Sequence, residues 1–176
     1  MSSSGDLPGR DDTGVGDDPY DLERFVSAQN SADTYGHAIG ELRGGRKTTH
    51  WMWFVFPQLT GLGRSQMSRT YAISSLEEAA AFLRHPVLGP RLIDCTGALL
   101  DVQDRHASEI LGAVDAQKLQ SSMTLFMRAA PGVALFGEVL VRYFGGGPDP
   151  ATDRRLGWGP DGDRGEVGGA AVPPPP

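Results

Sequence analysis

The sequence predicts an all-α fold, a compact array of six to eight helices in a single domain with disordered tails. Apolar residues recur every three or four positions through most of the chain, which is the spacing of a buried helix face. No segment shows the alternation of apolar and polar residues that marks a half-buried strand. A length of 176 residues suits one hydrophobic core.

The two ends of the chain differ in composition from the middle. Residues 1–19 are rich in Ser, Gly and Asp, and residues 157–176 end in four prolines. Neither segment can bury enough apolar surface to offset the entropy lost on folding, so we expect disordered tails around a helical domain at residues 20–156. The tails carry the whole formal charge of −6, because acids and bases balance between them. We therefore expect no nucleic-acid-binding face.

The first part of the domain predicts three helices. Asp21 is a plausible N-cap for the first, and Asp33 starts the second, which stops at the glycines at 44–45 because glycine readily adopts the left-handed conformation there. The third is a short buried piece over residues 50–56. It ends before Pro57, since the residue before a proline disfavours helix.

The rest of the domain predicts further helices. Ser75 and Glu78 have the spacing of a capping box, and their helix ends at His85. Pro90 fits the first turn of the next helix. Asp115 is a candidate N-cap for the helix after that.

Two more helices complete the array. One covers residues 133–144 and is stopped by three glycines, and a short one covers residues 149–156. Both follow the proline at 131, near which the preceding helix should end.

The single cysteine, Cys95, cannot form an internal disulfide, so a reducing compartment such as the cytoplasm is expected. No apolar run approaches the roughly 20 residues of a membrane helix, and the N-terminus lacks a signal-peptide pattern. We therefore expect a cytoplasmic protein with no membrane contact.

One segment, KTTHWMWFVFPQLTGLGRS at residues 47–65, gathers residue types that packing alone does not explain. It holds two of the three tryptophans, a histidine, a glutamine and a Gly-Leu-Gly turn, with cationic residues at both ends. No acidic residue lies between Glu41 and Glu77. This composition predicts a functional site.

His50 and Gln58 are the candidate catalytic residues. The imidazole can act as acid or base near neutral pH, and the amide can orient a substrate or a water. A histidine that only packs between helices is the alternative. Trp51 and Trp53 can stack on a planar ligand, but both cannot face the same way on a helix, and a core position is favoured for them.

Candidate anion-binding residues surround this pair. Cationic side chains, a glycine turn and a hydroxyl can together cradle a phosphate or carboxylate. The candidates of this kind are Arg46, Lys47, Gly61, Gly63, Arg64 and Ser65. A plain turn is the alternative, because the segment lacks the pattern of a P-loop and follows no strand.

A second candidate group lies in the helix that follows Asp115. Lys118, Ser121 and Ser122 belong to a run with three hydroxyls in mid-helix, where such residues are unfavourable. In a ligand-binding site, Ser121 or Ser122 would line the far wall. The alternative is that the hydroxyls only bond the backbone one turn earlier.

No metal or cofactor is expected. The four histidines have no partners at metal-ligand spacing, and Cys95 lies among apolar residues, which suits a structural thiol.

The segments RFVSAQ, ELRGGRKTTHWMWFVFPQLTGLGRS, YAISSLEEAAAFLRHPVLGPRL and KLQSSMTLF occur in this order. Together they resemble the family called domain of unknown function 1810, from about Tyr20 to Leu156. The resemblance implies a mostly helical bacterial domain with no established activity. Members are often labelled calpastatin, but such inhibitors are disordered repeat proteins, unlike this aromatic-rich core. A fainter analogy is to the helical NADAR superfamily, proposed to act on ADP-ribose-like N-glycosides.

Two functions fit these features. The first is binding of a small anionic, nucleotide-like ligand, with hydrolysis or N-glycoside cleavage as the accompanying reaction. It requires the candidate side chains to converge on one cleft. The second is a non-catalytic interaction module that recruits a protein partner through its proline-rich tail. The sequence does not define the oligomeric state.

Overall fold

The computed structural model describes residues 17–159, in which helices are joined by loops and turns. Its elements are α1 (Glu23–Asn30), η1 (Ser31–Asp33), α2 (Thr34–Arg43), α3 (Met52–Val55), α4 (Gln66–Thr70), α5 (Leu76–Arg84), α6 (Leu88–Asp101), α7 (Ala107–Leu111), α8 (Ala113–Ala129), α9 (Ala134–Phe144) and α10 (Pro150–Leu156). The predicted all-α fold is confirmed. One isolated parallel bridge joins Leu59 and Ile73, and residues 17–159 contain no strand.

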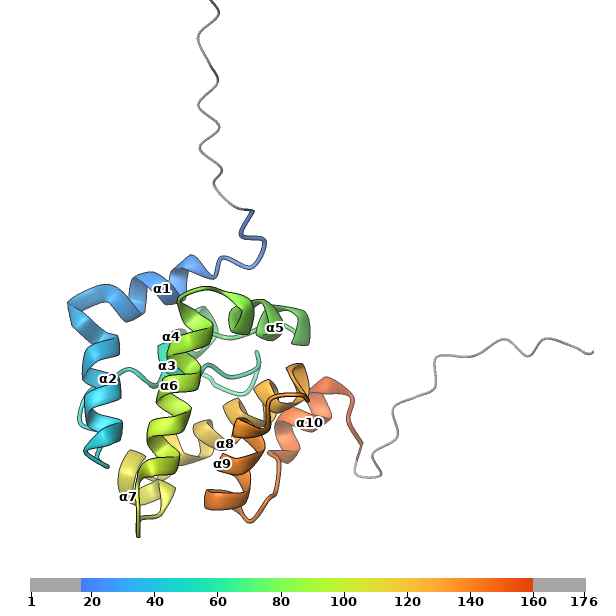
Figure 1. The fold of residues 1–176 in the computed structure, drawn as a ribbon. Coiled ribbons are helices and arrows are strands. Elements are labelled where there is room, and N and C mark those ends of the chain that lie inside the picture. The colour runs from blue at the N-terminus through green and yellow to red at the C-terminus, as the bar shows by residue number, and fades with distance from the viewer. Residues whose placement is uncertain (1–16, 160–176) are drawn as a thin grey trace, which may run out of the picture.

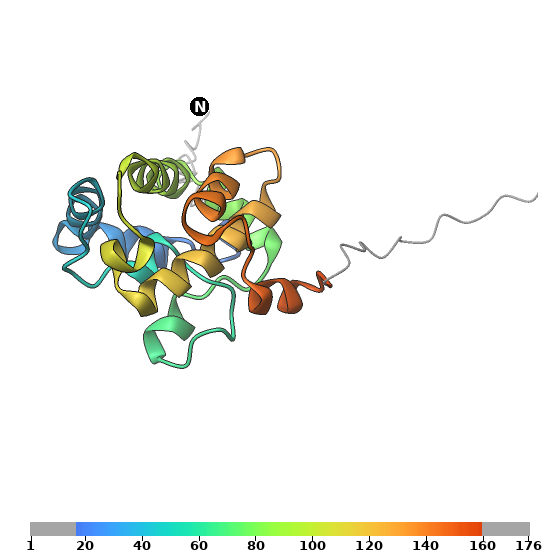
Figure 2. The same ribbon diagram turned by 90° about the horizontal axis from the view of Figure 1, so that it is seen from below.

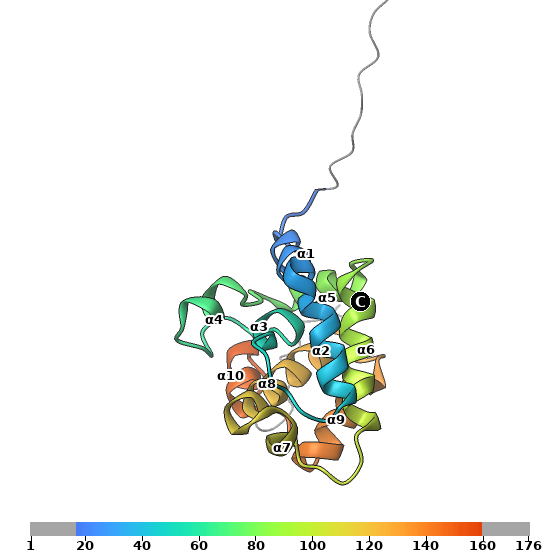
Figure 3. The same ribbon diagram turned by 90° about the vertical axis from the view of Figure 1, so that its left-hand side faces the viewer.

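Two long helices organise the array. Figure 1 shows α6 running down the front of the molecule, between α2 on the left and α9 on the right. The longest helix, α8, lies behind α6 and packs against α5, α7, α9 and α10. Figures 2 and 3 show α4 standing away from this packed body, at the tip of the segment that joins α3 to α5.

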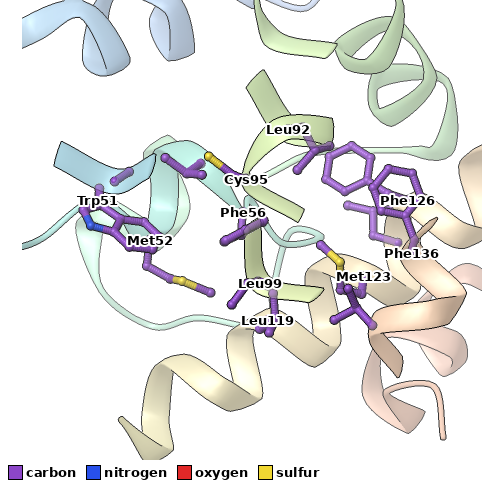
Figure 4. Close-up of a cluster of buried hydrophobic side chains, with 14 of the residues drawn as sticks. Trp51, Met52, Phe56, Leu92, Cys95, Leu99, Leu119, Met123, Phe126 and Phe136 are labelled. Carbon is purple, nitrogen blue, oxygen red and sulfur yellow. The ribbon is translucent and has the colours of Figure 1, made fainter. Parts of the chain in front are cut away.

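The core fills the space between α6, α8 and the segment around α3. Figure 4 shows Trp51 and Met52 on one side and Phe126 and Phe136 on the other. The rings of Phe126 and Phe136 have centroids 5.7 Å apart, a distance typical of favourable aromatic pairs. Cys95 is fully buried in this core, in agreement with its predicted structural role.

Several predicted helix ends are confirmed. The hydroxyl of Ser75 accepts the N–H of Glu78 at 3.2 Å and caps α5. Asp149 caps α10 by accepting the N–H of Thr152 at 2.8 Å. The left-handed glycine after α2 is Gly45, with φ of 69°.

Two predicted caps are wrong. The side chain of Asp18, and not that of Asp21, accepts the N–H groups of Leu22 and Glu23 at the start of α1. Helix α8 begins before Asp115, after Gly112, whose φ of 84° suits glycine. Asp115 therefore lies inside the first turn, where its carboxylate is free to bind lysines.

The described residues contain ten α-helices, more than the six to eight predicted. The unexpected ones, α4 and α7, have five residues each. A helix this short shows less than two turns of apolar spacing, so periodicity cannot reveal it. No helix in residues 17–159 is long and apolar enough to cross a bilayer.

Candidate functional site

A polar cleft of about 430 Å³ opens between α8, the loop after α3 and the start of α10. Its walls carry three side-chain amides, one ammonium group, one hydroxyl and one carboxylate. The lining residues are Gln58, Leu62, Gly63, Val114, Gln117, Lys118, Gln120, Ser121, Asp149 and Ala151.

Helix α8 supplies half of this lining. Val114, Gln117, Lys118 and Ser121 are three or four positions apart, so they share one face of the helix. Lys118 is the cation of the cleft, and its Nζ bonds Oδ1 of Asp115 at 2.8 Å.

Asp115 joins Lys118 to a second lysine from another part of the chain. Its Oδ2 lies 2.9 Å from Nζ of Lys47. Burial alone would raise the pKa of Asp115, but the bonds from the two lysines outweigh it and lower this pKa below the ordinary value. The carboxylate therefore stays ionised and fixes both ammonium groups.

Each of these lysines also covers a tryptophan. Lys118 Nζ lies 4.8 Å from the ring centroid of Trp53, and Lys47 Nζ lies 5.2 Å from that of Trp51. Both distances are within the range of cation–π attraction. Trp53 thus stands at the side of the cleft, next to the cation that lines it.

The opposite wall comes from the loop between α3 and α4. The N–H of Ile73 donates to the carbonyl of Gln58 at 2.8 Å, which holds the base of this loop. Further along, the carbonyl of Gly61 accepts from Arg155 of α10 at 2.8 Å. Gly63 lines the cleft and lies against Ser68, so closely that a Cβ on Gly63 would meet that of Ser68 at 2.3 Å.

Two hydroxyl groups of α8 hold the third wall of the cleft, which Asp149 forms at the start of α10. Ser121 Oγ lies 3.1 Å from Oδ2 of Asp149, and Thr124 Oγ1 accepts the N–H of Asp149 at 2.7 Å. Both hydroxyls also bond the carbonyl four residues earlier, of Gln117 and Gln120. The backbone bond expected as the alternative for Ser121 is thus observed, together with a tertiary contact that the sequence did not reveal.

Four residues of the sequence-predicted site line the cleft: Gln58, Gly63, Lys118 and Ser121. Lys47 and Trp53 do not line the cleft but are connected to Lys118. Lys47 shares the carboxylate of Asp115 with it, and the ring of Trp53 makes the cation–π contact. Ser122 follows on the same helix and is fully buried.

Trp51 lies in the core. It has no exposed surface, and its Nε1 donates to Oε2 of Glu41 at 2.8 Å. Trp51 therefore occupies the core position that the sequence favoured for the tryptophans.

The remaining predicted residues lie outside this cleft. Arg46, His50, Arg64 and Ser65 are exposed and do not line it, and Gly61 instead contacts Arg155. Ser65 has a local role, because its hydroxyl caps α4 by accepting the N–H of Ser68.

Sequence reasoning missed three polar lining residues, Gln117, Gln120 and Asp149. Gln117 could have been found, because it shares a helix face with Ser121. Asp149 was recognised only as the start of a helix, and its approach to α8 depends on the course of the chain after α9.

No group of three or more metal-binding side chains occurs in the part of the chain that the structure describes. A second hollow, of about 540 Å³, lies between α8 and α9 and is mostly apolar, with lining residues that include Met127, Leu140 and Val141. Its charged lining residues are Glu138 and Arg142.

The fold and cleft define a small single-domain, all-α protein with a polar cleft beside its longest helix. The chain belongs to the family described as "Protein of unknown function (DUF1810)", whose model matches residues 19–156. It is similar to a solved structure, that of the conserved hypothetical protein Rv1873 from Mycobacterium tuberculosis, with 54% sequence identity and a TM-score of 0.77. The match covers 80% of this chain and 99% of the other. No curated protein matches the chain.

Proposed function

We propose that the cleft beside α8 binds a small anionic ligand of the nucleotide type. The observation that carries this proposal is that Lys118 lines the same cleft as the side chains of Gln58 and Gln117. Within residues 17–159, neither amide makes a hydrogen bond to another group. A cation next to uncommitted amides suits a ligand that joins an anion to a polar ring or sugar.

The acidic residue of the cleft does not oppose this assignment. Asp149 Oδ2 accepts from the N–H and the hydroxyl of Thr152, at 2.8 and 2.6 Å, as well as contacting Ser121. This oxygen is thus already engaged by hydrogen-bond donors at the start of α10. Lys118 remains the charged donor of the cleft.

The hypothesis of hydrolysis or N-glycoside cleavage belongs to the same proposal, with a different acid–base residue. His50 does not line the cleft, whereas Asp149 is the acidic residue among those that do. Its Oδ1 accepts no hydrogen bond from the described residues. Asp149 is therefore our candidate for activating a water. The alternative function, an interaction module acting through the proline-rich tail, stays a prediction, because that tail lies outside the described residues.

The test is thermal shift of the full chain with phosphate, AMP, ADP-ribose and other phosphate-bearing metabolites. A ligand at a hundredfold its dissociation constant adds about 2.7 kcal/mol to the free energy of unfolding. Lys118→Met should abolish the shift, measured against its own ligand-free melting temperature. Arg46→Met is the matched control, because Arg46 is an exposed cation outside the cleft.

Two results would contradict the proposal: no shift with any compound, or equal shifts in both variants. For the reaction, a compound that binds should be converted by the unaltered protein and left intact by Asp149→Asn. Asparagine remains a good N-cap, so this variant should keep α10 folded.

A further inference from the structure

Two buried polar side-chain atoms in residues 17–159 have no hydrogen-bond partner: Nε1 of Trp53 and Oγ of Ser122. Buried polar groups are nearly always paired, because an unpaired one loses its bonds to water without replacement. Two such groups call for a functional explanation.

Both groups belong to residues that adjoin Lys118. The ring of Trp53 lies under its ammonium group, with Nζ 4.8 Å from the ring centroid. Ser122 follows Lys118 by four residues on α8, so the two side chains are neighbours on one side of the helix. Lys118, which lines the cleft, therefore adjoins both residues.

The hydroxyl of Ser122 also differs from the other buried hydroxyls in helices. Those of Thr96, Ser121 and Thr124 each donate to the carbonyl four residues earlier, at 2.7, 3.1 and 2.8 Å. Ser122 makes no such bond, although it is fully buried. Its hydroxyl is thus uncommitted, although a serine in a helix can bond the carbonyl four residues earlier.

We propose that Trp53 and Ser122 are ligand-binding residues that hold the phosphate group of the ligand together with Lys118. This inference rests on the proposed function of the cleft and names the chemistry that it recognises. An indole N–H and an ammonium group only donate hydrogen bonds, and the hydroxyl can donate a further one. A set made of donors fits a group with several acceptor oxygens and a negative charge, as a phosphate has.

The indole N–H of Trp53 provides a direct measurement. In the full-length ¹⁵N-labelled protein, the Trp53 indole signal is assigned by its loss in Trp53→Phe. Inorganic phosphate and AMP are then titrated at constant ionic strength, with adenosine as the control that lacks a phosphate. We expect phosphate and AMP to shift the Trp53 signal, and adenosine to leave it in place. The Trp51 indole, which donates to Glu41, should stay unchanged throughout.

Ser122→Ala provides the second arm. Loss of one hydrogen bond to a charged group should weaken AMP binding about tenfold. The ligand-free variant should melt at the same temperature as the unaltered protein or higher, because it lacks an unpaired hydroxyl. A lower melting temperature would show that the hydroxyl is already bonded, for instance to a trapped water, and would overturn the inference.

The two proposals fail in different ways. If AMP shifts the side-chain amide signals of Gln58 and Gln117 but not the indole signal of Trp53, the cleft binds its ligand without these donors, and only the inference is wrong. If neither phosphate nor AMP shifts any of these signals, both the inference and the phosphate-binding function are wrong. A response to inorganic phosphate alone would assign the site to the free ion and not to a nucleotide.

Discussion

Trp51 and Glu41 form a hydrogen bond of 2.8 Å between Nε1 and Oε2, which ties the start of α3 to the end of α2. The same carboxylate accepts the N–H and the hydroxyl of both Thr48 and Thr49, at 2.7–3.1 Å. One acid at the edge of the acid-free segment thus organises the turn before α3. Because the carboxylate that accepts these hydrogen bonds belongs to α2, the turn itself needs no acidic residue.

Glu41→Gln should destabilise the protein by about 1–3 kcal/mol, since several donors lose a charged acceptor. The measurement is urea unfolding at pH 7. Glu138→Gln is the control, because Glu138 is exposed on α9, and it should change the free energy of unfolding by less than about 0.5 kcal/mol. Equal effects in the two variants would show that the Glu41 bonds add nothing to stability.

The contribution of Glu41 should also depend on pH. Burial alone would raise its pKa, but the bonds from Thr49, Thr48 and Trp51 lower it from 4.5 to about 2. The folded protein therefore binds this proton less readily than the unfolded chain. The stabilisation is fully present above pH 4.5 and is lost as the pH falls towards 2. The stability difference between the unaltered protein and Glu41→Gln should shrink over this range. A constant difference would contradict the shift in pKa.

Local signals predicted the helices well, and long-range contacts explain the errors. Ser75 and Gly45 act within one turn of their helices, so their neighbours in sequence suffice to identify them. Asp21 failed as a cap because Asp18 competes for the same N–H groups. Asp115 failed because α8 already begins at Ala113, and its carboxylate bonds lysines instead of capping the helix.

The candidate site was predicted only in part, because some of its residues meet through long-range contacts. Helical spacing alone puts Lys118 and Ser121 on one face of α8. The same spacing indicated that Trp51 and Trp53 diverge, but not which one is core, because that depends on the bond from Trp51 to Glu41. Asp149 reaches the cleft only through the packing of α10 on α8.

Thr124→Val should cost about 1–3 kcal/mol of stability. Its hydroxyl is the acceptor for the N–H of Asp149, and valine would leave that donor without a partner. Thr96→Val is a matched control, because Thr96 is equally buried but its hydroxyl only donates to the carbonyl of Leu92. The control should lose clearly less stability. Chemical denaturation of both variants makes the comparison, and equal losses would show that the Asp149 bond is unimportant.

Gly40→Ala should stabilise the protein by about 0.4–1 kcal/mol. Gly40 lies inside α2, and a Cβ there would meet no atom within 4 Å. Alanine also favours helix more than glycine does. Gly89→Ala should have the opposite effect, because its Cβ would lie 2.0 Å from the carbonyl oxygen of Leu83. Thermal melting of the pair checks the prediction, which fails if both variants move in the same direction.

The thiol of Cys95 should be unreactive while the protein is folded. Desolvation by burial, with a smaller effect of the charge of Asp94, raises its pKa to about 12. Only about one molecule in ten thousand would then carry the reactive thiolate at pH ~8. The side chain is also fully buried, so a reagent must wait for the core to open. With Ellman's reagent at the same pH, we expect very slow reaction of the native protein and immediate release of one equivalent per chain in guanidinium chloride. Rapid reaction without denaturant would show that the interface between α2 and α6 opens readily, contrary to its close packing.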